Sequence, residues 1–239
     1  MTGIDQLSHF TPLDGAALAL LIGGWLLTGL AIDKAPLSRP SVSVLMARYR
    51  REWMVQMIGR EARIFDAQLL ASLRQGTAFF ASASLIAIGG AMAMLGDLEQ
   101  VIGIAGDLTP GREPVIVWEV KIAVILIFLT NAFLKFVWSN RLFGYCAVVM
   151  AAVPNDPEHP AAAPRAAKAA EINITAARGF NRGLRAIYFA LATTAWLLGP
   201  VPLLMAAGVT CLVLLRREFA SQSRAALMRP DMSGDHTQT

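Results

Sequence analysis

The chain has 239 residues, of which 55% are hydrophobic and only 16% are charged. Soluble domains carry about 25% charged residues, so this composition excludes an ordinary soluble globule, and its wealth of hydrophobic residues excludes intrinsic disorder. The formal charge of +4 does not indicate nucleic-acid binding, because the basic residues flank apolar segments, as the positive-inside rule describes. We therefore predict an all-α fold, a polytopic membrane bundle of about five transmembrane helices, with no nucleic acid among its partners.

The first apolar segment, at residues 13–32, is preceded by residues that favour a helix start. Thr11 is suited to cap the helix, Pro12 fits its first position, and the Asp14 carboxylate is favourable near the positive end of the helix dipole. No Lys or Arg precedes this segment, so we interpret it as a retained span and not as a signal peptide. Small residues at four-residue spacing predict the face on which another helix packs closely: Gly15, Ala19 and Gly23.

Residues 41–75 form a basic, amphipathic region. Apolar residues recur there at near-helical spacing, and no proline follows Pro40 before Pro110, which predicts one or two helices. We expect this region to lie on the cytoplasmic side, along an anionic membrane surface.

The second and third spans are predicted at residues 76–95 and 115–138. The loop between them is acidic, so we expect it to face away from the cytoplasm. Nothing breaks the helical pattern after the third span until Pro154, which predicts a long cytoplasmic extension of that helix.

Residues 186–215 admit two interpretations. Two short apolar runs flank Gly199-Pro200-Val201-Pro202, a strong turn signal. One long kinked span would place the C-terminus outside, whereas a tight hairpin of two spans, at 183–198 and 203–217, would return it inside. We favour the hairpin, because Arg224 and Arg229 add positive charge to the tail.

The distribution of basic residues predicts the orientation. Residues 33–75, residues 139–185 and the tail hold 8, 6 and 4 Lys and Arg residues, whereas the loop after the second span holds 1. The positive-inside rule then places the N-terminus outside and the C-terminus in the cytoplasm of a bacterial cell, as a multi-pass inner-membrane protein. We expect one integral membrane domain over residues 1–230 and a disordered tail at 231–239.

Polar residues within the third span are the first candidates for function, since they are costly in lipid. At 100° per residue, Lys121, Asn131 and Lys135 share a stripe about 100° wide. This stripe predicts a cationic face that lines a site or pathway for an anion or a lipid headgroup. The alternative is that the two lysines extend to opposite membrane surfaces and Asn131 bonds a neighbouring helix.

A second group of candidates follows in residues 178–185. Arg178, Arg182 and Arg185 share one helical face beside Asn181, and Arg141 is placed to join them from the third span. Guanidinium groups in this arrangement are suited to hold phosphate, although a non-specific positive belt would look the same. The carboxylates considered as partners are Glu61, Asp66 and Glu171, and the sequence leaves this pairing open.

Sequence motifs of catalysis and metal binding are missing. Cys146 and Cys211 lie far apart in apolar stretches, and the three histidines form no cluster with metal-ligand spacing. No phosphate-binding loop, nucleophile elbow or zinc-protease motif occurs. We therefore expect neither an enzyme nor a cofactor or metal site.

Two segments resemble a known family. Residues 118–121 (WEVK) with 131–145 (NAFLKFVWSNRLFGY), and residues 180–192 (FNRGLRAIYFALA), are similar to membrane proteins grouped as domain of unknown function 599. The resemblance runs from the first span to Arg217 and implies a membrane fold without an established activity. The chain departs from the family pattern at Gly179, where a histidine often precedes the Phe-Asn pair, so the resemblance implies no proton transfer there.

The leading hypothesis is an integral membrane protein that binds or conducts a small anion or a lipid headgroup as a homo-oligomer, with membrane lipids as partners. The alternative is a structural or assembly protein in which the same charges only orient and join the helices.

Overall fold

The computed structural model describes residues 10–99, 102–103 and 114–230. These residues form α-helices and one short 3₁₀ helix, and the described part of the chain contains no strand. The all-helical class is therefore confirmed. The predicted tail at 231–239 lies outside the described residues, as does most of the predicted acidic loop.

Within these described residues, three helices are long and apolar enough to cross a membrane: α2 (Pro12–Asp33), α4 (Ile64–Gly96) and α6 (Val115–Ala151). They contain the first three predicted spans. At 1.5 Å per residue, the 33 residues of α4 and the 37 of α6 extend about 50 and 55 Å. A bilayer core is about 30 Å thick, so both helices are long enough to continue well beyond it, as predicted for α6.

The start of α2 forms as the sequence predicts. The Thr11 side chain accepts a hydrogen bond from the backbone N–H of Asp14, the Asp14 carboxylate accepts one from the backbone of Thr11, and Pro12 occupies the first turn. This reciprocal arrangement satisfies two N–H groups that have no partner within the helix.

The predicted packing face of α2 is wrong. A Cβ atom added at Gly15 or Gly23 would meet nothing within 4 Å, whereas one added at Gly24 would lie 2.6 Å from the sulfur of Cys211 in α8. Successive side chains of a helix point about 100° apart. The close approach of α2 and α8 therefore occurs at Gly24, beside the stripe of small residues and not on it. The buried face consists of Asp14, Ala17, Leu21, Thr28 and Ile32.

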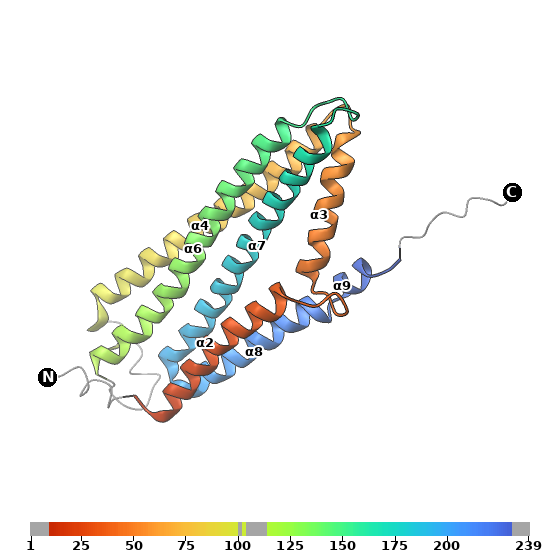
Figure 1. Cartoon of the computed structure of the whole chain (residues 1–239). Coiled ribbons are helices and arrows are strands. Elements are labelled where there is room, and N and C mark those ends of the chain that lie inside the picture. Colours follow the sequence, from red (N-terminus) through yellow and green to blue (C-terminus); the bar gives the residue numbers. More distant parts are fainter. Residues whose placement is uncertain (1–9, 100–101, 104–113, 231–239) are drawn as a thin grey trace.

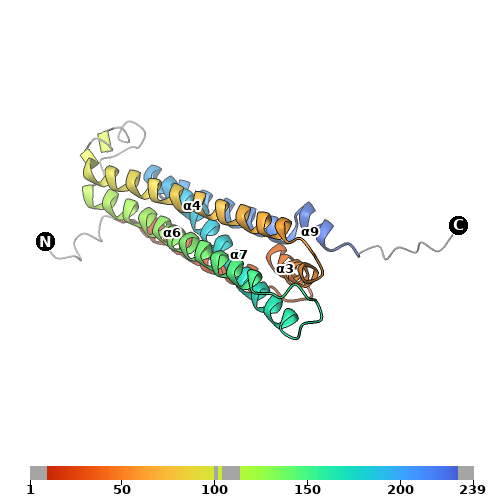
Figure 2. The same cartoon turned by 90° about the horizontal axis from the view of Figure 1, so that it is seen from above.

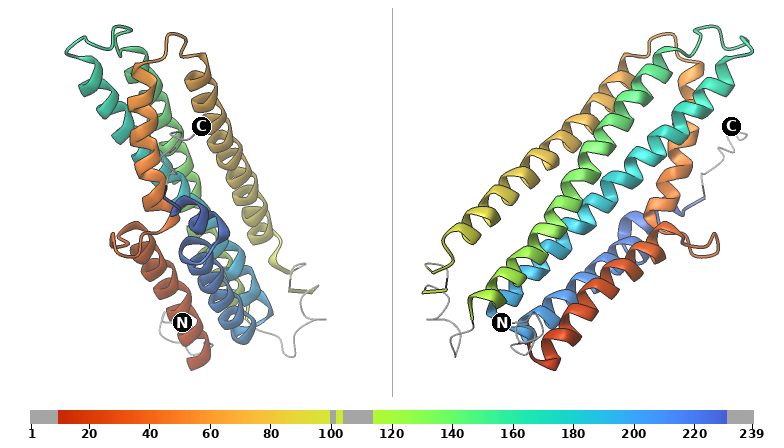
Figure 3. Two further views of the ribbon diagram at one scale, coloured as in Figure 1. Left: turned by 90° about the vertical axis from the view of Figure 1, so that its right-hand side faces the viewer. Right: turned by 60° about the vertical axis from the view of Figure 1, so that its left-hand side comes forward.

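The helices pack as two groups (Figure 1). Helix α6 lies along α7 (Ala162–Thr194) and also contacts α4, while α2 pairs with α8 (Pro200–Phe219). The right panel of Figure 3 shows both groups from another side, with α7 joining them. At the crossing of α6 and α7, a Cβ atom added at Gly183 would lie 2.7–2.9 Å from the ring of Phe136, so glycine allows these two helices to approach closely.

The chain reverses after α7. A 3₁₀ segment, η1 (Ala195–Leu198), ends at Gly199, whose φ of +119° is a conformation that residues with a Cβ rarely adopt. Pro200 then begins α8, which runs back from the end of α7 (Figure 1). A short helix, α9 (Gln222–Leu227), follows.

The predicted amphipathic region is divided between α3 (Val42–Ile58) and the first turns of α4. Helix α3 packs on α7 near the start of α4, and Figure 2 shows it beside the bundle from above. Buried residues of α3, α4, α6 and α7 form a second hydrophobic core here, which includes Met54, Met57, Leu70, Phe143 and Ala166. The extension of the bundle beyond the apolar spans is thus a packed structure in its own right.

Candidate functional site

A groove between α2, α6 and α7 contains most of the predicted site residues. Its volume is about 510 Å³. Asn131 and Lys135 of α6 line it together with Arg178, Arg182 and Arg185 of α7. Helix α2 and the residue after it supply the opposite wall, with Trp25, Leu26, Gly29, Leu30, Asp33 and Lys34. We call this space the α2–α6–α7 groove.

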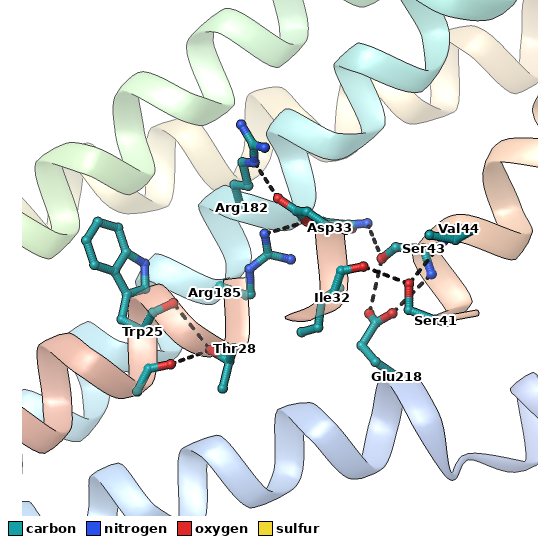
Figure 4. Close-up of polar contacts among 12 residues, drawn as sticks. Trp25, Thr28, Ile32, Asp33, Ser41, Ser43, Val44, Arg182, Arg185 and Glu218 are labelled. Carbon is teal, nitrogen blue, oxygen red and sulfur yellow. Dashed lines mark hydrogen bonds and ion pairs between the residues drawn. The ribbon is translucent and has the colours of Figure 1, made fainter. Parts of the chain in front are cut away.

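Asp33, at the last turn of α2, connects the two sides of the groove (Figure 4). Its carboxylate accepts a hydrogen bond from Arg185 at 2.9 Å and another from Arg182 at 2.7 Å. The Arg185 side chain is only 6% exposed and that of Asp33 12%, whereas Arg182 is 47% exposed. The loss of either partner of a buried ion pair is costly, so of the two contacts between Asp33 and α7 the one with Arg185 should contribute more to holding α2 against α7.

The groove carries an excess of positive charge. Five cationic side chains line it, against the single carboxylate of Asp33. The side chains of Lys34, Lys135 and Arg178 form no hydrogen bond or ion pair with the described residues. The formal charge of the lining is therefore +4, and three of its cations are available to an anion.

One wall of the groove is apolar. The Trp25 ring packs edge-on against Phe128 with centroids 5.4 Å apart, which fixes its position beside the cations. Leu26 and Leu30 leave about half of their surface uncovered. The groove thus offers a cationic side and an apolar side, an arrangement that suits an amphiphile.

Lys121 lies apart from the groove. Its side chain is buried, its ammonium nitrogen lies 5.4 Å from the centre of the Trp118 ring, and it attracts the buried carboxylate of Asp14. Asp14 also accepts a hydrogen bond of 2.7 Å from the indole nitrogen of Trp196. The predicted stripe therefore divides, with Asn131 and Lys135 in the groove and Lys121 in a buried polar cluster near the start of α2.

Two further predicted residues lie outside the groove. Arg141 donates to the Tyr145 hydroxyl and lies over the ring of that residue, on an exposed surface. Asn181 donates to the Ser43 hydroxyl at 3.3 Å and lines a neighbouring cavity.

The carboxylates considered from sequence are not the partners of the α7 arginines. Glu171 pairs with Arg51 at 2.7 Å, and Asp66 pairs with Arg60 and accepts from the Trp53 indole. Asp33 was overlooked, although a signal for it exists. In the predicted topology, Asp33 ends the first span on the side where the fourth predicted span begins, which would bring these two chain segments together. Within the described residues, no group of three or more His, Cys, Asp or Glu side chains is arranged to hold a metal ion.

The family profile described as "Protein of unknown function, DUF599" matches residues 16–223. The chain belongs to this family. Every residue that lines the groove lies within the matched region, whereas Asp14 precedes it. No curated protein and no solved structure shows significant similarity to the chain. The DUF599 match and the apolar helices are compatible with a membrane protein, and the family itself supplies no activity.

Proposed function

We propose that this DUF599 protein is an integral membrane protein that binds the phosphate-bearing headgroup of an anionic lipid in the α2–α6–α7 groove. The observation that carries the proposal is the excess of cations beside an apolar wall. Guanidinium and ammonium groups form strong charge-assisted hydrogen bonds with phosphate oxygens. The exposed leucines of α2 are suited to contact the acyl chains of the same lipid.

The proposed topology has five spans, with the second half of α7 and η1 as the fourth and α8 as the fifth. The 20 residues of α8 extend about 30 Å, enough to cross a bilayer core. Helix α8 packs along α2, and its outer face exposes apolar residues that lipid would cover: Met205, Val209 and Leu212. These features support the hairpin over a single kinked span.

The proposed orientation has the N-terminus outside and the C-terminus in the cytoplasm of a bacterial cell. Arginine-rich α3, the end of α6 and the basic first half of α7 lie together at one end of the bundle, which supports placing that end inside. A reporter fused after Thr239 should be active only in its cytoplasmic form. An active periplasmic reporter at that position would refute this orientation.

Lipid binding can be tested with the purified protein in nanodiscs that contain either phosphatidylglycerol or phosphatidylcholine. We expect retention of phosphatidylglycerol after solubilisation, with Lys135→Gln weakening it about tenfold, the usual effect of losing one charge-assisted contact. Arg141→Gln is the matched control, because it removes an exposed cation of the same helix that does not line the groove. Equal retention of both lipids would refute the proposal.

We propose binding and not conduction. An anion pathway along α6 would need Lys121 and Lys135 on one accessible face, and the burial of Lys121 speaks against it. Anion flux into liposomes that responds to Lys135→Met would favour conduction instead. We propose no catalytic role.

The second candidate function is assembly, with the charges serving only to join helices. The Asp33–Arg185 pair and the burial of Lys121 near Asp14 favour it, since both place charge inside the bundle. This candidate predicts a stable complex with a partner protein after mild solubilisation and no preference among lipids. We propose a homo-oligomer in either case, which the mass of the solubilised protein would test.

A further inference from the structure

A second cavity lies next to the groove, between α3 and the ends of α2 and α8. Its volume is about 490 Å³, and α7 forms its floor. Five arginines line it, against the carboxylates of Asp33 and Glu218: Arg48, Arg50, Arg51, Arg178 and Arg217. We call it the α3 cavity.

Both carboxylates of the α3 cavity already have partners. Asp33 is paired with the arginines of α7, as described above. Glu218 accepts hydrogen bonds from the Ser43 backbone N–H at 3.0 Å and from the Ser43 hydroxyl at 3.3 Å (Figure 4). Its negative charge therefore lies at the first turn of α3, where the helix dipole favours an anion.

The arginines are less fully compensated. Arg48 and Arg178 form no side-chain hydrogen bond or ion pair with the described residues. Arg50 donates to Asn173, a neutral amide, and burial lowers the pKa of its guanidinium from its ordinary value. A guanidinium stays charged at neutral pH even so. The residues that line the cavity carry a formal excess of three positive charges, and Arg51 is also paired with Glu171, which lies outside the lining.

The α3 cavity is suited to a ligand from water. Helix α3 carries Arg48, Arg50, Arg51 and Glu52 within five residues, and so many charges in little more than one turn are costly in a bilayer core. The groove, in contrast, has the exposed leucines of a candidate span along one side. The volume of the cavity is that of a typical small-molecule site.

We propose that the α3 cavity binds a soluble, phosphorylated small molecule, at a site distinct from the lipid groove. Several arginines around one space match the multiple negative charges and the oxygen geometry of phosphate groups. The proposed orientation places this cavity on the cytoplasmic side.

Titration calorimetry of the full-length protein in detergent with inorganic pyrophosphate tests this assignment. We expect saturable binding that weakens with added salt. Arg48→Gln, a change at an exposed residue, should weaken it about tenfold, and Arg51→Gln should weaken it to a smaller extent because Glu171 already pairs with that residue. Glu218→Gln should strengthen binding severalfold, because it removes a competing negative charge, and a purely structural role would not produce this gain.

Lys135→Gln is the matched control, since Lys135 lines the groove and not the α3 cavity. It should leave pyrophosphate binding unchanged. Absence of saturable binding, or equal affinity of Arg48→Gln and the unaltered protein, would overturn the inference. Weaker binding in Lys135→Gln would place pyrophosphate in the groove and overturn it as well. Loss of phosphatidylglycerol retention in Arg48→Gln would assign the cavity to lipid, whereas lipid retention without pyrophosphate binding would leave only the groove proposal standing.

Discussion

Replacing Asp33 with asparagine separates two effects of the charges in the groove. The carboxylate holds α2 on α7 through Arg182 and Arg185, and it also lowers the positive potential that an anionic headgroup would meet. The substitution Asp33→Asn should therefore destabilise the empty protein and strengthen the binding of an anionic lipid.

The loss of stability comes mainly from Arg185. Removing one partner of a buried ion pair costs about 3–5 kcal/mol, and we expect about 2–3 kcal/mol here, because asparagine still accepts a hydrogen bond and the pair borders a groove. The contact with the half-exposed Arg182 adds less than about 1 kcal/mol. The matched control is Glu171→Gln, which breaks the exposed Arg51–Glu171 ion pair. This pair has the same 2.7 Å length as the Arg182–Asp33 contact, and its loss should cost less than about 1 kcal/mol.

The gain in lipid affinity follows from the charge of the groove, which rises from +4 to +5 when Asp33 is neutralised. At a separation of ~8 Å, one unit charge contributes about 0.5–2 kcal/mol for effective dielectric constants between 80 and 20. That energy corresponds to roughly 2- to 30-fold tighter binding.

Unfolding in mixed detergent micelles, followed by tryptophan fluorescence with and without phosphatidylglycerol, measures both effects. The lipid should restore part of the stability that Asp33→Asn removes, because it binds only the folded state. A variant as stable as the unaltered protein would show that the pair does not hold the helices together. A variant with lower lipid affinity would refute the electrostatic reasoning for the groove.

Three further predictions concern helix packing and a buried hydrogen bond, and thermal unfolding in detergent checks each of them. Gly183→Ala places a methyl group against the buried Phe136 ring and should cost about 1–3 kcal/mol, whereas Gly179→Ala, whose added Cβ meets its nearest atom at 3.5 Å, should be neutral or slightly stabilising. An equal effect of these two would contradict the close approach of α6 and α7. Trp196→Phe removes the indole donor to buried Asp14 and should cost about 1–3 kcal/mol; unchanged stability would exclude this hydrogen bond as a contributor. Gly24→Ala should destabilise through the sulfur of Cys211, with Cys211→Ala restoring stability in the double variant, while Gly23→Ala should have little effect; failure of the double variant to recover would mean that α2 and α8 pack differently.

Hydropathy was enough to predict the first three apolar helices, because a span of sufficient length is a property of a local window. The cap at Thr11 and Asp14 was also predictable, since both residues lie within one turn. The contacts between helices were not predictable from local sequence. The stripe of Gly15, Ala19 and Gly23 predicts close packing equally well for any partner, and only the position of α8 selects Gly24 instead.

The candidate site shows the same division between local and long-range information. Arg178, Arg182 and Arg185 lie within about two turns and share a helical face, and all three line the same groove. The carboxylate that meets them is about 150 residues away in the chain. No local sequence pattern indicates that pairing. Comparing the positions of the residues relative to the predicted spans would have favoured Asp33 over Glu171.

The groove and the α3 cavity share two side chains of opposite charge, Asp33 and Arg178. A negative charge bound in either space interacts electrostatically with both residues. By thermodynamic linkage, each ligand then changes the affinity of the protein for the other ligand by the same factor. Two anions so placed repel each other, so an occupied groove should weaken binding in the cavity to the same degree that an occupied cavity weakens binding in the groove. Neutralising Asp33 raises the positive potential in both spaces and neutralising Arg178 lowers it in both, whereas Lys135 and Arg48 each affect one space. The pattern of these four substitutions therefore distinguishes two coupled anion sites from a single continuous basic surface, on which every lost cation would weaken both ligands alike.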